Sequence, residues 1–297
     1  MSRRVEPVRS SLSEPWRKLT RDRRHGATEV QRRALRSLHR LGTPGTKYLS
    51  EAELRWLRRW CREMGRVQPA MGGLVQLARS FSEWTENAPS PCPRGPLRRL
   101  VQRHERALAH EVALLRRTAV GRFPPKALVM TFSRSQAVLD LLRDLPPARR
   151  PQKLVVPRST PGGEGRSLYT ELRRTYGARV RLIDDEEIPT HLRGPSACVL
   201  VGADTIYSDG TLLHKVGTRS LARLAARRGV PFIALSPSSR ILPWGPPRRG
   251  AWGRWFDLTP GRWVSEVWTE RGRWRPGRLR DRLRLDLRRA RHRPTRR

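Results

Sequence analysis

After residue 124 the chain repeats one pattern, in which short apolar runs rich in β-branched residues alternate with stretches of helical periodicity. The apolar runs cover 127–131, 153–156, 179–183, 197–201, 231–235 and 263–268, and the helical stretches cover 135–143, 165–176 and 217–228. Runs that are apolar throughout are typical of strands buried on both faces of a parallel sheet. Their alternation with helices predicts an α/β fold with a mostly parallel, doubly wound, Rossmann-like sheet over residues 121–272.

The first 120 residues show helical periodicity without candidate strands. The pattern Ser50-Glu-Ala-Glu53 is a capping box that predicts a helix start, and a long helix is predicted over 97–117. We therefore expect an N-terminal helical domain at 28–120. A disordered basic arm at 1–27 is expected before it, and a flexible basic tail at 273–297 is expected after the α/β domain.

The chain is strongly basic, with a formal net charge of +37, and only five of its 63 basic Lys and Arg residues are lysines. A field of this kind attracts polyanions such as RNA in a salt-dependent way. Because arginine is spread over the whole chain, a bias in the base composition of the genome explains the charge equally well. Both interpretations stay open at this point.

Several classes of protein are disfavoured by the sequence. No apolar run is long enough to cross a bilayer, and the first residues contain no apolar signal core. The three cysteines, Cys61, Cys92 and Cys198, have no metal-ligand spacing and no disulfide framework. We expect a cytoplasmic protein that binds no membrane, no metal and no cofactor.

Polar residues follow the buried run 197–201 at the place where open α/β sheets bind their ligands. Ligands of such sheets lie outside the carboxyl ends of strands and near helix N-termini. Asp204 follows the run, and Lys215, Gly217 and Thr218 lead into the next helix. We expect these side chains to converge on one site.

A second such place follows the first predicted strand, at Thr131-Phe-Ser-Arg-Ser135. Backbone N–H groups at the start of the next helix suit a phosphate, and Arg134 suits a bidentate contact with it. The alternative is that Ser133 or Ser135 only caps the helix. The spacing alone does not decide between them.

The segment Gly202-Ala-Asp-Thr-Ile-Tyr-Ser-Asp-Gly210, followed by Lys215-Val-Gly-Thr218, resembles the shared core of the initiation factor 2B alpha, beta and delta subunits. The same core occurs in two sugar-phosphate isomerases, which act on methylthioribose 1-phosphate and ribose 1,5-bisphosphate. Three further stretches agree in order, namely 130–135, 155–161 with Gly165, and 256–260 with 268–272. The resemblance implies a dimer formed through the α/β domain, and phosphate or packing contacts from Lys215, Gly217 and Thr218.

The resemblance also identifies departures from the isomerases. Those enzymes carry a proton-handling cysteine at the position of Ser133, opposite the aspartate that Asp204 matches. A thiol has a pKa of about 8.5 that neighbours readily lower, whereas an unactivated serine hydroxyl does not exchange its proton near neutral pH. His214 stands where the isomerases carry asparagine, and Thr160 stands where the family pattern has an arginine. These changes argue against retained isomerase activity.

The sequence therefore leads to one hypothesis and two alternatives. We expect a non-catalytic, initiation-factor-2B-like protein, forming a homodimer, that binds a phosphorylated sugar or a nucleotide. The candidate ligand-binding residues are Thr131, Ser133, Arg134, Ser135, Gly165, Asp204, His214, Lys215, Gly217 and Thr218. The first alternative is an aldose–ketose isomerase of a sugar 1-phosphate in which Asp204 is catalytic. The second is a protein that binds RNA or the ribosome through its basic surface.

Overall fold

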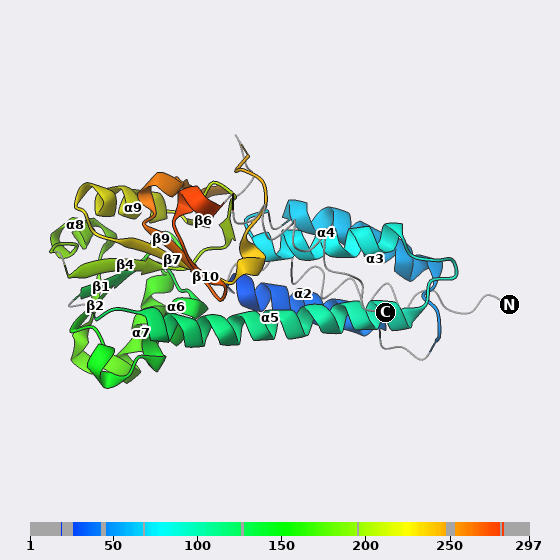
Figure 1. The fold of residues 1–297 in the computed structure, drawn as a ribbon, viewed down its shortest axis with the longest axis horizontal. Coiled ribbons are helices and arrows are strands. Elements are labelled where there is room, and N and C mark those ends of the chain that lie inside the picture. The colour runs from blue at the N-terminus through cyan, green and yellow to red at the C-terminus, as the bar shows by residue number, and fades with distance from the viewer. Residues whose placement is uncertain are drawn as a thin grey trace. The chain divides into compact units, whose positions relative to one another are not determined.

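Helices α2 to α5 build the N-terminal part of the chain in the computed structural model (Figure 1), which describes residues 19, 26–42, 46–67, 69–125, 128–194, 196–247, 253–279 and 281. Their bounds are α2 Ala27–Gly42, α3 Glu51–Val67, α4 Gly72–Glu86 and α5 Arg94–Arg122. The chain divides into two compact units, Met1–His110 and Glu111–Arg297, so that α5 runs from the first unit into the second.

The start of α3 is fixed by the capping box that the sequence predicts. The backbone N–H of Ser50 donates to Glu53 Oε2 at 2.8 Å, and the backbone N–H of Glu53 donates to Ser50 Oγ at 3.3 Å. Two N–H groups that the first turn of a helix leaves without partners are thereby satisfied.

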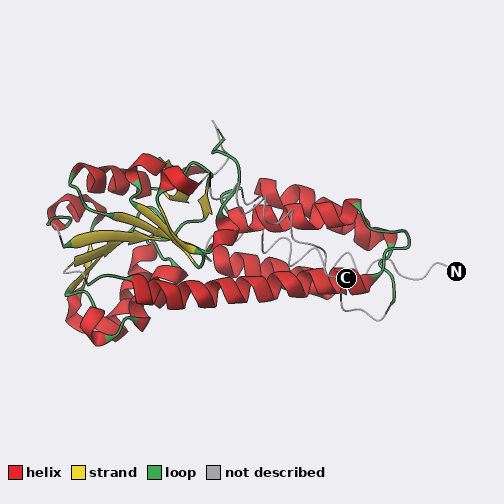
Figure 2. Ribbon diagram, viewed as in Figure 1, coloured by secondary structure: helices red, strands yellow, loops and turns green. Residues whose placement is uncertain are grey.

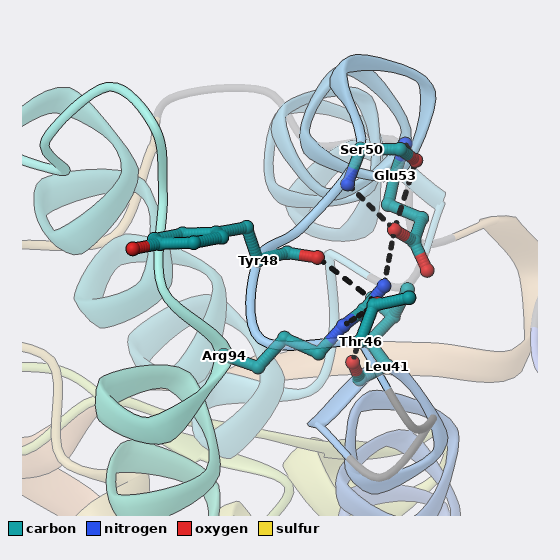
Figure 3. Close-up of polar contacts among 6 residues, drawn as sticks. All are labelled: Leu41, Thr46, Tyr48, Ser50, Glu53 and Arg94. Carbon is teal, nitrogen blue, oxygen red and sulfur yellow. Dashed lines mark hydrogen bonds and ion pairs between the residues drawn. The ribbon is translucent and has the colours of Figure 1, made fainter.

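The same carboxylate joins three segments of the first unit (Figure 3). Arg94, at the start of α5, donates to Glu53 at 2.7 Å, to the Leu41 carbonyl at 2.7 Å and to Thr46 Oγ1 at 2.9 Å. The side chains of Arg94 and Glu53 are 8% and 6% exposed, so this ion pair is buried. It ties the end of α2 and the start of α3 to the start of α5.

The second unit is a sheet with helices on both faces (Figure 2). The strands are β1 Leu128–Thr131, β2 Lys153–Pro157, β3 Val180–Ile183, β4 Ala197–Val201, β7 Phe232–Leu235, β9 Glu266–Thr269 and β10 Gly272–Trp274. Their order is β10-β9-β7-β4-β1-β2-β3, and every neighbouring pair is parallel except β9 with β10. This confirms the predicted α/β class. The five strands from β1 to β7 lie within one residue of their predicted bounds.

Alternate residues of the central strands enter two different cores. Met130, Val155 and Val199 pack in one core with residues of α9 (Thr218–Arg227). Val129, Leu154 and the other neighbours of those residues pack in a second core with α6 (Gln136–Asp144) and α7 (Glu164–Tyr176). A strand covered on both faces has no polar side, which explains the continuous apolar runs.

A small antiparallel sheet, absent from the sequence prediction, stands beside the large one. It consists of β5 Thr205–Ile206, β6 Leu212–Lys215 and β8 Phe256–Thr259, in the order β5-β6-β8. The turn predicted at 207–210 joins β5 to β6. His214 and Lys215 therefore lie on a strand, not on a loop that leads to α9.

Parts of the two predicted flexible ends fall outside the described residues. Of the arm 1–27, residues 19, 26 and 27 are described, and of the tail 273–297, residues 273–279 and 281 are described. Within the tail, Arg273 and Trp274 pair with β9 as part of β10. The strand predicted at 263–268 begins later, at Glu266, because Gly261–Trp263 form a 3-10 turn. No helix in the described part of the chain has the length and apolar character needed to cross a bilayer.

Candidate functional site

The order of the parallel strands reverses between β1 and β4. The chain builds outward from β1 through β2 to β3, then returns to place β4 on the other side of β1, followed by β7 and β9. The crevice at such a reversal, outside the carboxyl ends of the two strands, is where open α/β sheets bind ligands. Ser133 follows β1 and Asp204 follows β4, so both lie at this reversal.

The loop after β1 is held by its neighbour after β2. Ser133 has a φ of 60°, in the left-handed region, and its backbone N–H donates to Ser159 Oγ at 2.7 Å. Ser135 takes the N-cap position of α6 without a side-chain capping bond. Thr131 Oγ1 is buried and has no hydrogen-bond partner among the described residues.

Arg134 does not point to an anion site in this structure. Its Nε donates to Glu171 Oε1 on α7 at 2.6 Å, and its Nη2 donates to Gln136 at 3.2 Å. The guanidinium is thus engaged in an ion pair. A phosphate contact would require it to leave Glu171.

Asp204 and His214 form a buried pair. His214 Nδ1 lies 2.9 Å from Asp204 Oδ2, and the side chains are 7% and 13% exposed for His214 and Asp204 respectively. Burial by itself raises the pKa of Asp204, but the hydrogen bond from His214 and the charges of His214, Arg240 and Lys215 outweigh it, and the pKa lies below the ordinary value of 3.8. Asp204 is therefore an ionised acceptor. His214 Nε2 is buried and has no partner among the described residues.

Lys215 is enclosed by a carboxylate and two aromatic rings. Its ammonium forms an ion pair with Glu164 at the start of α7, and it lies 5.6 Å and 5.3 Å from the ring centres of Trp255 and Phe256. The other carboxylate oxygen of Glu164, Oε2, is buried without a partner in the described part of the chain. The pair brings the end of β6 to the start of α7.

The loop between β2 and α7 receives its anionic partner from within the protein. The backbone N–H groups of Ser159 and Thr160 each donate to the carboxylate of Asp185 at 2.8 Å. Gly165 packs directly on β2, because a Cβ there would lie 1.9 Å from the Pro157 carbonyl oxygen. Gly165 thus serves the packing of α7.

The N-terminus of α9 is capped in the same way. The Asp257 carboxylate accepts from the backbone N–H of Gly217 at 2.8 Å and from that of Arg219 at 3.2 Å. Burial raises the pKa of Asp257 above 3.8, although these two bonds oppose the change. Thr218 is fully buried, and its hydroxyl donates to the Lys215 carbonyl at 2.6 Å. In this structure Gly217 and Thr218 shape the helix start.

The predicted site residues therefore fall into two groups. Thr131, Ser133, Ser135, Asp204, His214 and Lys215 come together at the carboxyl ends of β1, β4 and β6. Arg134, Gly165, Gly217 and Thr218 make packing, capping or ion-pair contacts instead.

Four residues of this region were missed by reasoning from the sequence, namely Glu164, Asp185, Arg240 and Asp257. Arg240 is buried and donates to the Ala203 carbonyl at 2.7 Å, next to Asp204. Asp185 belongs to a run of carboxylates that was interpreted as a solvated turn. Asp257 gave a usable signal, because it lies in one of the stretches that carry the family resemblance. Within the described residues, no group of three or more His, Cys, Asp or Glu side chains is arranged to hold a metal ion.

Comparisons with known proteins agree with this architecture. A sequence profile described as the initiation factor 2 subunit family matches residues 95–247. A 5-deoxyribose 1-phosphate isomerase of Moorella thermoacetica is 30% identical over 150 residues, which cover 42% of this chain and only 43% of that enzyme. A translation initiation factor eIF-2B subunit 2-like protein of Pyrococcus abyssi is 28% identical over 265 residues, 84% of this chain and 91% of that protein. The crystal structure of translation initiation factor eIF-2B from Pyrococcus horikoshii OT3 superposes with a TM-score of 0.77 at 24% identity, covering 90% of this chain and 98% of that one.

Proposed function

The chain belongs to the initiation factor 2 subunit family, and on that premise we propose that it binds a phosphorylated sugar or a nucleotide at the carboxyl ends of β1 and β4. Its role is regulatory or related to translation, and the bound ligand is not converted. The family resemblance further leads us to propose that the protein acts as a homodimer joined through the α/β unit.

One observation carries this proposal. Three buried polar atoms without a partner among the described residues, Thr131 Oγ1, His214 Nε2 and Glu164 Oε2, belong to segments that meet at the carboxyl edge of the sheet. Buried polar groups in folded proteins are nearly always hydrogen-bonded, because leaving one unpaired costs roughly 1–3 kcal/mol. A polyhydroxylated ligand supplies both donors and acceptors to such atoms.

The absence of a thiol supports binding without isomerisation. Ser133 has no base within hydrogen-bond distance among the described residues, and its backbone N–H is engaged by Ser159. An alkoxide does not form readily under these conditions. The position that carries a proton-handling cysteine in the isomerases thus has no equivalent chemistry here.

The runner-up is aldose–ketose isomerisation of a sugar 1-phosphate. It is favoured by relatives that are named as isomerases and by the Asp204–His214 pair, in which an imidazole is available for proton transfer. A panel of aldose 1-phosphates incubated with the enzyme distinguishes the two functions. Turnover that disappears in Asp204→Asn would establish the isomerase, and no ketose product from any sugar would remove it.

Ligand binding is tested by thermal shift with pentose phosphates and nucleoside monophosphates. Binding to the folded state raises the melting temperature in proportion to the logarithm of ligand concentration above Kd. We expect a shift in the wild-type protein that is lost in Lys215→Met. Lys153→Met is the matched control, because Lys153 lies at the start of β2, at the opposite edge of the sheet. Wild-type protein that shows no shift with any compound would overturn the proposal.

A further inference from the structure

The hydrogen bond between His214 and Asp204 fixes which nitrogen of the imidazole carries a proton. An ionised carboxylate only accepts hydrogen bonds, so His214 Nδ1, 2.9 Å from Asp204 Oδ2, must be the donor. The neutral ring then presents Nε2 as a lone pair. His214 Nε2 is consequently an acceptor that needs a donor.

No donor from the protein reaches this nitrogen. The residue is 5% exposed, and Nε2 is buried with no partner within the described part of the chain. The oxygens of a phosphate dianion are acceptors and do not satisfy it. A sugar hydroxyl does, because its O–H donates to the nitrogen.

The space beside the ring is kept open by a glycine. A Cβ at Gly202, just after β4, would stand 2.4 Å from Ser135 Oγ and 3.7 Å from His214 Cε1. The side chains of Ser135 and His214 therefore approach the same point from two sides, one from the start of α6 and the other from β6. Any side chain at position 202 would fill this point.

The charges near His214 also separate the two ends of a phosphorylated ligand. The carboxylate of Asp204 is bonded directly to the ring, and its negative charge disfavours a phosphate at the same point. The cations of the region are Arg240, beside Asp204, and Lys215, the next residue along β6. The hydroxyl end and the phosphate end of the ligand are thus given different partners.

We propose that His214 is the specificity-determining residue of the site, accepting at Nε2 a hydrogen bond from one particular hydroxyl of a sugar phosphate beside Gly202. This inference rests on the proposed function, because it assigns a role within the same site. It names the ligand as a polyol that carries a free hydroxyl at that position. Ligands without this hydroxyl leave the acceptor unpaired and are rejected.

The experiment compares ribose 1-phosphate with its 2-deoxy, 3-deoxy and 5-deoxy analogues by isothermal titration calorimetry. In the wild type, we expect one of the three analogues to bind roughly tenfold or more weakly than ribose 1-phosphate, since an unpaired buried acceptor is costly. In His214→Phe, which keeps a planar ring without an acceptor, this discrimination should disappear. His214→Asn, whose amide oxygen accepts, should retain part of it. His110→Phe, at an exposed position in α5, is the control.

The possible failures are distinguishable. Wild-type protein that binds none of the four compounds removes the proposed function, and the role of His214 falls with it. Wild-type protein that binds all four equally, or His214→Phe that keeps the discrimination, overturns the role of His214 and leaves ligand binding in place. Circular dichroism of each variant shows whether a lost signal reflects loss of the fold.

Discussion

At the scale of single residues, the site depends on a few backbone and side-chain positions with no tolerance for substitution. Ser133 and Ser159 both adopt the left-handed region, with φ of 60° and 62°, and Ser159 Oγ accepts the N–H of Ser133. Residues other than glycine pay a conformational cost there, so the surrounding bonds must hold them. Strain of this kind tends to occur at functional sites, and these two residues flank the reversal of strand order.

Ser159→Ala tests whether this bond holds the loop. The substitution leaves the buried N–H of Ser133 without an acceptor, and we expect the free energy of unfolding to fall by roughly 1–3 kcal/mol. Urea denaturation followed by circular dichroism measures the change. Ser220→Ala, at an exposed position of α9, should have an effect near zero. Equal stability of the two variants would show that the loop is held by other contacts.

At the scale of elements, carboxylates from distant segments fix the starts of helices and loops. Asp257 from β8 caps α9, Asp185 binds the loop before α7, and Glu53 binds Arg94 at the start of α5. Each takes a place where a backbone or a guanidinium offers positive charge. Internal carboxylates therefore occupy several of the anion-binding places that the sequence suggested for a ligand.

Glu53→Gln tests the buried ion pair of the first unit (Figure 3). Removing one charge leaves Arg94 buried and unpaired, and we expect a loss of roughly 3–5 kcal/mol in the free energy of unfolding. Burial raises the pKa of Glu53, but hydrogen bonds from Arg94 and Ser50 outweigh it and bring the pKa below 4.5. A carboxyl with a lowered pKa stabilises the fold above its unfolded value and loses that contribution as the pH falls through the folded value.

The expected pH dependence follows from that sign. Wild type and Glu53→Gln should differ by a constant amount from pH 7 down to about 5, and the difference should shrink as the pH falls below 4.5. Chemical denaturation at a series of pH values measures it. A difference that grows on acidification would contradict the assignment.

The elements also show how far the sequence carries. Strands buried on both faces are recognisable because every residue is apolar, as in Ala197–Val201, whose predicted and observed bounds coincide. β5 and β6 were missed because they are short, and β6 ends in His214 and Lys215, which read as polar loop residues. The location of the site follows from strand ends. The pairing of Lys215 with Glu164 does not, since it depends on how β6 and α7 meet in space.

At the scale of the whole molecule, the open questions are the oligomeric state and the charge. β8 is an edge strand of the small sheet and carries partly exposed apolar side chains, including Phe256. Such an edge is usually covered by another chain or protected. The fold of the family and this edge both favour a second copy as the partner.

We expect light scattering after gel filtration to give twice the 34.3 kDa mass of the chain. The reason is the apolar edge of the small sheet, which a second copy covers. A single-chain mass at every concentration tested would contradict the dimer.

The alternative function in RNA binding makes a separate prediction about residues 282–297, which contain eight arginines. If that alternative holds, truncation after Asp281, which keeps β10, should weaken RNA binding and make its dependence on salt shallower. Filter binding at several salt concentrations measures both quantities. Identical salt slopes for the two proteins would exclude a role for this segment.

The most direct test of the ligand site is the NMR signal of His214 Hε1 during titration with ribose 1-phosphate. The chain has seven histidines, and the signal of His214 is identified by its absence from His214→Asn. A sugar phosphate bound beside Gly202 should move this signal in a saturable way and leave that of the exposed His110 unchanged. Saturable binding seen by calorimetry while the His214 signal stays in place would put the ligand elsewhere and contradict the account.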